Sequence, residues 1–242
     1  MVNYVSIFAA LTTFLIFKCT LTVYKHFYSN KPPIGKEKVA ISLFLGSGGH
    51  TSELLQIIDA LDFIKFSPRL YLISSGDSLS TTKVRTLENK RSADAMLEWS
   101  SAGYYDISYL HRTRTPGQSI TSVPLNFFIT FFQAIVLAIL PPSDISSPSN
   151  PSGRNNSVGD LPQPQLGDLL IMNGPATSIP LVCAVWVAKF IGLPHPRMVY
   201  IESWTRVDSL SKTGKIVKPF VDTFITQWEG NTEEEIKANW FI

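Results

Sequence analysis

Strand-like and helix-like segments alternate along most of the chain, and this alternation constrains the fold more than any other feature. A buried strand is predicted at Val39–Leu45, and apolar residues recur at helical spacing in Thr51–Leu61. Further predicted strands are 70–74, 104–110, 168–172, 198–201 and 223–227, and further predicted helices are 78–90, 120–140 and 179–191. Because such alternation produces right-handed βαβ units, we expect one parallel sheet with helices on both faces, an α/β architecture.

An apolar run at the N-terminus is the second constraint. Val2–Phe17 has no charged residue, and after Lys18 the run continues through Cys19–Tyr24, which is about the length of a membrane-spanning helix. Lysines follow the run and none precedes it, which predicts that the rest of the chain lies in the cytosol. We expect a transmembrane anchor at 1–24 and a linker at 25–38. A helix lying on the membrane surface or packed on the domain is the alternative.

Length and composition predict a single folded domain after the linker. A chain of 242 residues with ordinary apolar content is hard to divide into two full domains. Pro141–Gln165 is rich in Pro, Ser, Asn and Gly and cannot bury enough apolar surface to fold. We therefore expect a Rossmann-like domain at 39–228 with a disordered insertion at 141–167, followed by a tail at 229–242.

The charged residues, cysteines and histidines exclude several classes of function. The net charge is +2, and no basic stripe alternates with aromatic residues, so we expect no nucleic-acid partner. Cys19 and Cys183 form no CxxC pair, and the histidines never occur at metal-ligand spacing. We expect neither a metal ion nor a cofactor.

A glycine-rich corner separates the first predicted strand from the first helix of the domain. It consists of Gly46, Ser47, Gly48, Gly49, His50 and Thr51. Glycines let the backbone turn sharply and let a phosphate approach the N–H groups of a helix N-terminus. His50 can donate to a phosphate or transfer a proton near neutral pH. The spacing matches neither a P-loop nor the dinucleotide fingerprint, and a purely structural turn remains the alternative.

A second corner, at 173–177, repeats the pattern with Asn173 and Gly174 after a predicted strand and before a helix. Two such corners at the carboxyl ends of parallel strands face the same crevice, where ligands of open α/β sheets bind. Arg112 and Arg114 follow another strand at this edge. They could pair with a phosphate or an acidic partner, or they could be ordinary surface charges.

Three further segments are candidates for contact with a ligand, with lipid or with another protein. The polar segment 202–222 contains Trp204 and could contact a ligand or another protein. The apolar segment 120–140 is either a core helix or a helix that presents its phenylalanines to lipid, namely Phe127, Phe128, Phe131 and Phe132. The chain ends in Trp240, Phe241 and Ile242, which we expect to dock on a partner, since aromatic residues dominate interface anchors.

Three motifs in a fixed order resemble those of one family. They are GSGGHT at 46–51, NGPAT at 173–177, and YIES, RV, SLS, TGK and QW between Tyr200 and Trp228. With the N-terminal run, they resemble the membrane-anchor subunit of the two-subunit UDP-N-acetylglucosamine transferase of eukaryotic N-glycan assembly. The resemblance covers nearly all of the chain beyond the linker except the insertion. Ala176, where the family commonly has glycine, and the insertion depart from the pattern.

The resemblance implies a fold similar to the N-terminal acceptor domain of the bacterial peptidoglycan N-acetylglucosaminyltransferase, which is half of a GT-B glycosyltransferase. It also implies a single-pass protein of the endoplasmic reticulum membrane whose domain faces the cytosol. This chain would recruit a soluble catalytic subunit that binds UDP-N-acetylglucosamine. Only as a complex would the pair add the second N-acetylglucosamine to N-acetylglucosaminyl-diphosphodolichol. A non-enzymatic scaffold that only tethers a catalytic partner is the alternative.

The resemblance also suggests roles for individual residues. The corner Gly46–Thr51 would hold the acceptor diphosphate, with Asn173 and Gly174 at its rim and Arg112 and Arg114 as further contacts. His50 is the first candidate to orient or deprotonate the acceptor 4-hydroxyl, and Glu202 is the second.

Overall fold

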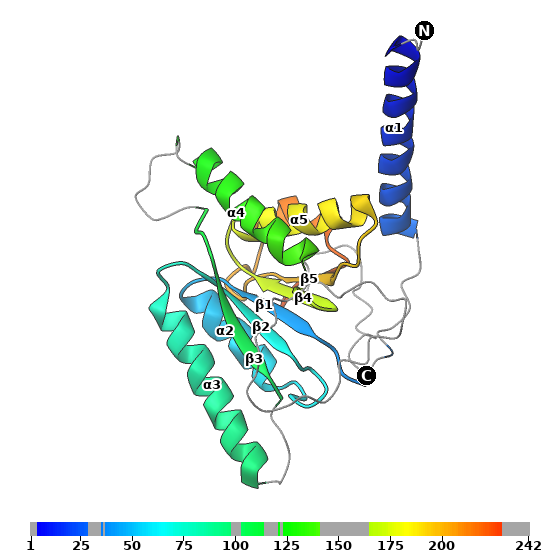
Figure 1. Cartoon of the computed structure of the whole chain (residues 1–242). Coiled ribbons are helices and arrows are strands. Elements are labelled where there is room, and N and C mark those ends of the chain that lie inside the picture. The colour runs from blue at the N-terminus through cyan, green and yellow to red at the C-terminus, as the bar shows by residue number, and fades with distance from the viewer. Residues whose placement is uncertain are drawn as a thin grey trace.

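The computed structural model describes residues 4–28, 35, 37–97, 103–113, 121, 123–140 and 165–228. Within these ranges one sheet of six parallel strands forms the centre of the molecule (Figure 1). The strands are β1 (Ile41–Leu45), β2 (Arg69–Ser74), β3 (Tyr105–Leu110), β4 (Leu169–Asn173), β5 (Arg197–Ile201) and β6 (Thr223–Ile225). Their order, β3-β2-β1-β4-β5-β6, is that of a Rossmann-like fold, and it confirms the predicted parallel α/β architecture.

Helices cover both faces of this sheet (Figure 1). Those of the domain are α2 (Gly49–Asp59), α3 (Ser78–Leu97), α4 (Val123–Ile139), α5 (Ser178–Ile191) and the short α6 (Lys212–Val217), which runs into a 3-10 turn at Lys218–Phe220. A further helix, α1 (Tyr4–Tyr28), precedes the sheet.

Alternate residues of the central strands point to two separate cores. In β1, Leu43 and Leu45 pack in one core with Leu54 of α2, whereas Phe44 packs in the other with Ala134 of α4. All five residues of β1 are buried, as expected for a parallel strand covered on both faces. This explains why the strand reads as a continuous apolar run.

The strand order creates a topological switch between β1 and β4. From β1 the chain proceeds outward to β2 and β3, and it then returns to pair β4 with the other side of β1. The connections that leave the carboxyl ends of β1 and β4 therefore run in opposite directions. In open α/β sheets this geometry produces a crevice for ligands.

Helix α1 extends away from the sheet, and its C-terminal end packs on the domain (Figure 1). There His26 Nδ1 lies 3.4 Å from Oδ1 of Asp222, and the His26 ring lies 4.7 Å from the ring of Trp186 of α5. The predicted membrane span at 1–24 is not shown: no helix in the described part of the chain has the combined length and apolarity that crossing a membrane requires.

Helix α4, in the apolar segment 120–140, has one buried side and one exposed apolar side. One side buries Thr130, Ala134, Leu137 and Ala138. On the opposite side Phe128 and Phe132 are exposed, whereas Phe127 and Phe131 are half-buried. The helix is thus a core element that also presents apolar side chains outward, and its contact with lipid stays a prediction.

Most of the predicted insertion and the whole predicted tail lie outside the described residues, including Trp240, Phe241 and Ile242. The described chain resumes at Gln165, and Leu166 is fully buried in the core beside Leu170. The core therefore resumes just before the predicted end of the insertion at 167.

Candidate functional site

The two glycine corners meet at the carboxyl ends of β1 and β4, where Leu45 is paired with Asn173. A Cβ placed on Gly46 would lie 2.5 Å from Cδ of Pro175, and one on Gly174 would lie 2.8 Å from Cγ of His50. Gly174 also has a φ of +105°, which disfavours other residues. Glycine is therefore needed at both positions for the two connections to approach each other.

The N-terminus of α2 faces open space. Gly48 caps the helix with a φ of +69° and without a side-chain hydrogen bond, and α2 begins at Gly49. Apart from the chain neighbours of each glycine and the backbone of α2 itself, no heavy atom of the described chain comes within 4 Å of a Cβ placed on Gly48 or Gly49. The first N–H groups of a helix have no partner within the helix, and they carry the positive end of its dipole. This end of α2 can therefore accept an anion, which a longer side chain at Gly49 would obstruct.

Thr51, predicted to bind substrate, is turned into the protein. Its side chain is fully buried, and its hydroxyl donates to the carbonyl of Gly46. The same hydroxyl lies 2.6 Å from the hydroxyl of Ser80 at the start of α3. Thr51 therefore closes the glycine corner from inside, whereas Ser47, Gly48 and Gly49 are exposed.

His50 is held through one of its two ring nitrogens. Nδ1 lies 2.8 Å from Oδ1 of Asn173 and 3.8 Å from Oε2 of Glu53. Because both oxygens are acceptors, they favour the tautomer with the proton on Nδ1. The neutral ring then has its lone pair on Nε2, and the side chain is 34% exposed. This is the arrangement of an accessible group that can accept a proton.

Asn173 makes the hydrogen bond that holds His50. Its side chain is fully buried at the end of β4, and its Nδ2 makes no hydrogen bond within the described chain. Native proteins rarely leave such a buried donor unpaired, and exceptions often occur at functional sites.

Tyr200 of β5 stabilises the second corner by a hydrogen bond. Its hydroxyl donates to the carbonyl of Gly174 at 3.0 Å. Burial, reinforced by the nearby charge of Glu202, raises the pKa of Tyr200. The hydroxyl therefore stays protonated and keeps donating throughout the physiological range.

Glu53, three residues after His50 on α2, was not among the predicted site residues. Its Oε1 accepts the N–H of Trp204 at 2.5 Å and a side-chain N–H of Gln227, and its Oε2 accepts the hydroxyl of Ser203 at 3.4 Å. Glu53 thus joins α2 to the connections after β5 and β6. The available sequence signal was its i,i+3 spacing from His50, which places both side chains on one face of the helix.

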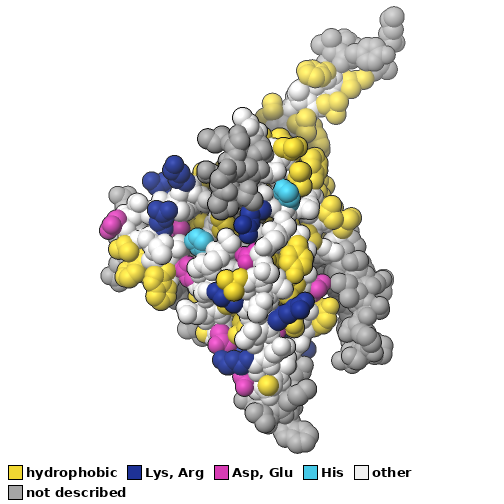
Figure 2. Space-filling view, turned by 90° about the vertical axis from the view of Figure 1, so that its left-hand side faces the viewer, with side chains coloured by type: hydrophobic (Ala, Val, Ile, Leu, Met, Phe, Trp, Pro, Cys, Tyr) yellow, Lys and Arg dark blue, Asp and Glu magenta, His cyan; other side chains and the backbone are white. Residues whose placement is uncertain are grey.

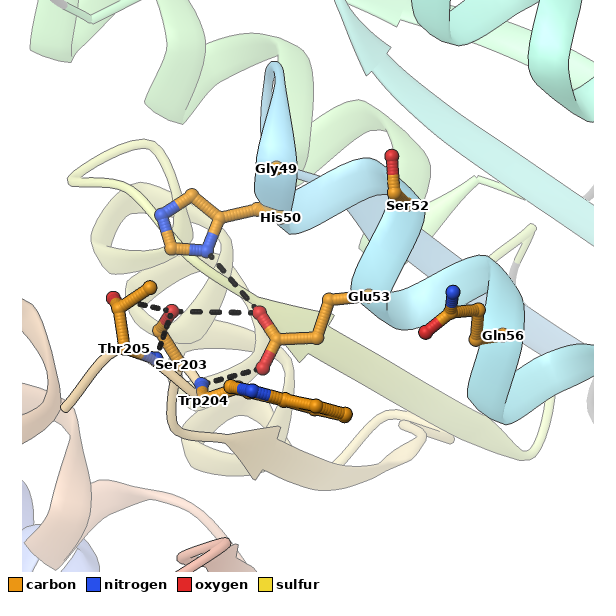
Figure 3. Close-up of a pocket in the computed structure, with 8 residues that line it drawn as sticks. All are labelled: Gly49, His50, Ser52, Glu53, Gln56, Ser203, Trp204 and Thr205. Atoms are coloured by element: carbon orange, nitrogen blue, oxygen red, sulfur yellow. Dashed lines mark hydrogen bonds and ion pairs between the residues drawn. The ribbon is translucent and has the colours of Figure 1, made fainter. Parts of the chain in front are cut away.

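A pocket of about 350 Å³ lies between α2 and the segment after β5 (Figure 3). Its lining consists of Gly49, His50, Ser52, Glu53, Gln56, Ser203, Trp204 and Thr205. The polar segment 202–222 therefore contributes its first part to the pocket that contains His50.

Glu202, the second catalytic candidate, is 2% exposed and does not line this pocket. Its Oε1 accepts the N–H of Ser203 at 2.9 Å, and its Oε2 accepts the N–H and the hydroxyl of Ser211, both at 3.0 Å. A Cβ on Gly214 would collide with the same carboxylate. The structure thus places Glu202 inside the turn that leads to α6, and its catalytic role stays a prediction.

Of the two arginines that the sequence predicts as diphosphate contacts, Arg112 lies among the described residues. Arg112 follows β3 and is half-buried, and the neighbouring Thr113 hydroxyl lies 2.8 Å from that of Thr177 in the second corner. The segment after β3 therefore reaches across the sheet edge towards β4, as the site requires. Arg114 lies outside the described residues.

Among the residues that the structure describes, no group of three His, Cys, Asp or Glu side chains could hold a metal ion. The site brings together the partly exposed imidazole of His50 and the N-terminus of α2.

The chain is similar to one protein family. Residues 41–242 match the family model described as "Oligosaccharide biosynthesis protein Alg14 like". The chain is 34% identical over 198 residues to the UDP-N-acetylglucosamine transferase subunit ALG14 of Cryptococcus neoformans, which covers 82% of this chain and 77% of the relative. It is 30% identical over 207 residues to the protein of the same name from Mus musculus, which covers 84% of this chain and 82% of the relative. No solved structure matches the chain.

Proposed function

We propose that this chain, which belongs to the Alg14-like family of oligosaccharide biosynthesis proteins, is the acceptor-binding subunit of a UDP-N-acetylglucosamine transferase. Its relatives in fungi and mammals are named as subunits of that transferase. The partner is a soluble catalytic subunit that binds UDP-N-acetylglucosamine. The pair adds the second N-acetylglucosamine to N-acetylglucosaminyl-diphosphodolichol at the cytosolic face of the endoplasmic reticulum.

One observation carries the proposal: His50 stands beside the open N-terminus of α2, at the switch between β1 and β4. The N–H groups of α2 and the exposed Gly48 and Gly49 bind the diphosphate of the lipid acceptor. The sugar attached to that diphosphate then lies next to His50. Arg112, which follows β3, adds positive charge at the same edge, and the role of Arg114 stays a prediction.

The histidine acts through Nε2. As the acceptor 4-hydroxyl oxygen attacks the anomeric carbon of the donor sugar, the bond from that carbon to UDP breaks and Nε2 takes the hydroxyl proton. Asn173 accepts from Nδ1–H, which fixes the tautomer, and the nearby carboxylate of Glu53 stabilises the imidazolium that forms. In this proposal Glu202 positions the loop and is not the base.

The donor site belongs to the partner. A GT-B enzyme needs two Rossmann-like domains that face each other across a cleft, and this chain forms one such sheet. The open edge at β1 and β4 is the surface that faces the second domain. The site is therefore divided between two chains, and activity requires both.

The lipid-linked acceptor also requires a membrane surface. We propose that α1 attaches the chain to the membrane: apolar side chains are exposed along it, Phe8, Leu11, Phe14, Ile16 and Phe17 among them. Figure 2 shows hydrophobic side chains on the described part of the segment that projects from the body. The exposed Phe128 and Phe132 of α4 provide a second apolar surface for the lipid tail.

Replacing the histidine in the reconstituted complex tests the proposal. We expect His50→Ala to lower kcat about 100-fold or more, because general-base catalysis contributes typically that much. Co-purification of the partner should not change. His50→Gln, which keeps a polar side chain of similar size, should also be impaired if proton transfer is the role of His50. Turnover near the wild-type rate in both variants contradicts the proposal.

A scaffold that only tethers the partner is the second candidate. The observation that favours it is the packing role of Gly46 and Gly174, which explains these glycines without any ligand. It does not explain the open space at Gly48 and Gly49. Binding of the acceptor by this chain therefore separates the two functions.

A further inference from the structure

Trp204 is exposed, yet its backbone is fixed on both sides. The residue is 56% exposed. Its N–H donates to Oε1 of Glu53 at 2.5 Å, and its carbonyl accepts the indole N–H of Trp228 at 2.6 Å. Exposed tryptophans in well-defined positions are common where proteins bind ligands or partners. Trp204 therefore needs an explanation that the fold alone does not give.

The indole ring of Trp204 forms one side of the pocket that contains His50. In Figure 3 the ring is seen edge-on below Glu53 and Gln56, so that one face is turned towards α2. His50 lies at the other end of the same pocket. A molecule that contacts His50 and fills this pocket would lie against the indole face.

The rest of the lining offers neutral hydrogen-bonding groups. Ser52, Gln56 and Thr205 contribute hydroxyl and amide groups, and no lysine or arginine is among the lining residues of this pocket in the described chain. The negative charge of Glu53 is already met by three donors. A diphosphate therefore finds its favourable place at the N-terminus of α2, at the end of the pocket that Gly49 lines.

This combination matches the surface of a sugar ring. The electron-rich face of an aromatic ring attracts weakly positive hydrogens, such as the C–H groups on one face of a pyranose. The hydroxyl and acetamide groups at the edge of the sugar can bond to the polar lining. Pockets that join an aromatic wall to a few polar groups are typical sites for small ligands.

We infer that Trp204 stacks on the sugar ring of the diphosphate-linked acceptor and holds its hydroxyl near His50. This assignment rests on the proposed function, because it places the diphosphate at the N-terminus of α2. The stacked sugar is the acceptor sugar, since the pocket that Trp204 shares with His50 adjoins the helix N-terminus that holds that diphosphate. Trp204 is thus a substrate-binding residue that the chemistry at His50 depends on.

The test measures both substrates in the reconstituted complex. We expect Trp204→Ala to raise the KM for the lipid acceptor about tenfold, the size of a lost aromatic contact, and to leave the KM for UDP-N-acetylglucosamine unchanged. Trp204→Phe, which keeps an aromatic face, should recover most of the loss. Leu79→Ala, at an exposed apolar residue of α3, is the matched control and should change neither KM.

The possible failures point to different errors. An active Trp204→Ala complex with the wild-type KM for the acceptor overturns the subsite alone. Loss of partner co-purification, or a raised KM for the donor, also overturns it, because Trp204 would then contact the partner or the donor. A wild-type complex that transfers no sugar rejects the proposed function, and this subsite with it.

Discussion

At the scale of the residue, the environment of His50 separates the roles of its two nitrogens. Asn173 accepts at Nδ1 and the carboxylate of Glu53 lies 3.8 Å from the same nitrogen, so that Nε2 is left for a substrate. Asn173 could not be predicted as a partner, because it lies 123 residues away, whereas the i,i+3 spacing of Glu53 from His50 is a local signal. The sequence thus shows the candidate histidine and one of its neighbours, but not the residue that accepts its hydrogen bond.

Tyr200 makes a prediction about pH. Burial raises its pKa above the ordinary value of 10.0, so the folded protein keeps the proton after the unfolded chain has lost it. Because the unfolded state then binds fewer protons, stability falls as the pH rises above 10, by up to about 1.4 kcal/mol per pH unit for this group.

Urea unfolding between pH 9 and pH 11 measures this effect. Tyr200→Phe should show a shallower loss of stability above pH 10, although it loses the hydrogen bond to Gly174 and is about 1 kcal/mol less stable at pH 7. Equal slopes for the wild type and the variant contradict the assignment.

At the scale of the element, the strands were more predictable than the connections between them. Strands buried on both faces, such as β1 and β4, read as continuous apolar runs, and the structure places both at the predicted segments. The turn from β5 to α6 was predicted only as a polar run. Its structure depends on the buried Glu202, whose carboxylate accepts hydrogen bonds from Ser203 and Ser211. No local sequence pattern predicts these hydrogen bonds.

Helix α1 makes a prediction about membrane attachment. Phe14 and Phe17 are 57% and 62% exposed, so that aspartate at both positions should leave the fold intact. Because a carboxylate is costly in an apolar layer, Phe14→Asp with Phe17→Asp should move the chain from the membrane pellet to the supernatant.

The same change on α3, Leu79→Asp, is the control, since Leu79 is exposed but lies on a different helix. Sedimentation of the chain from cell extracts is the measurement. Retention of the double variant in the membrane pellet contradicts the proposed role of α1.

At the scale of the whole molecule, the sheet order explains why the features of the site gather at one edge. The switch between β1 and β4 opens one edge, and both glycine corners and the Trp204 pocket lie along it. The sequence predicted that the two corners meet, because carboxyl ends of parallel strands share an edge. It could not predict the pocket, whose walls come from α2 and from the segment after β5 and are joined by Glu53.

Acceptor binding by the full chain in detergent, without its partner, tests the central claim most directly. The probe is a short-chain N-acetylglucosaminyl-diphosphoprenol, compared between the wild type, Gly49→Val and the control Gly35→Val. Beyond the chain neighbours of each glycine and the backbone of α2, no described atom lies within 4 Å of an added Cβ, so both variants should fold.

We expect Gly49→Val to raise the Kd for the probe about tenfold or more, because its side chain blocks the N–H groups of α2, whereas Gly35→Val binds as the wild type does. Equal binding by all three proteins, or no binding by the wild type, would contradict the claim that this chain holds the acceptor.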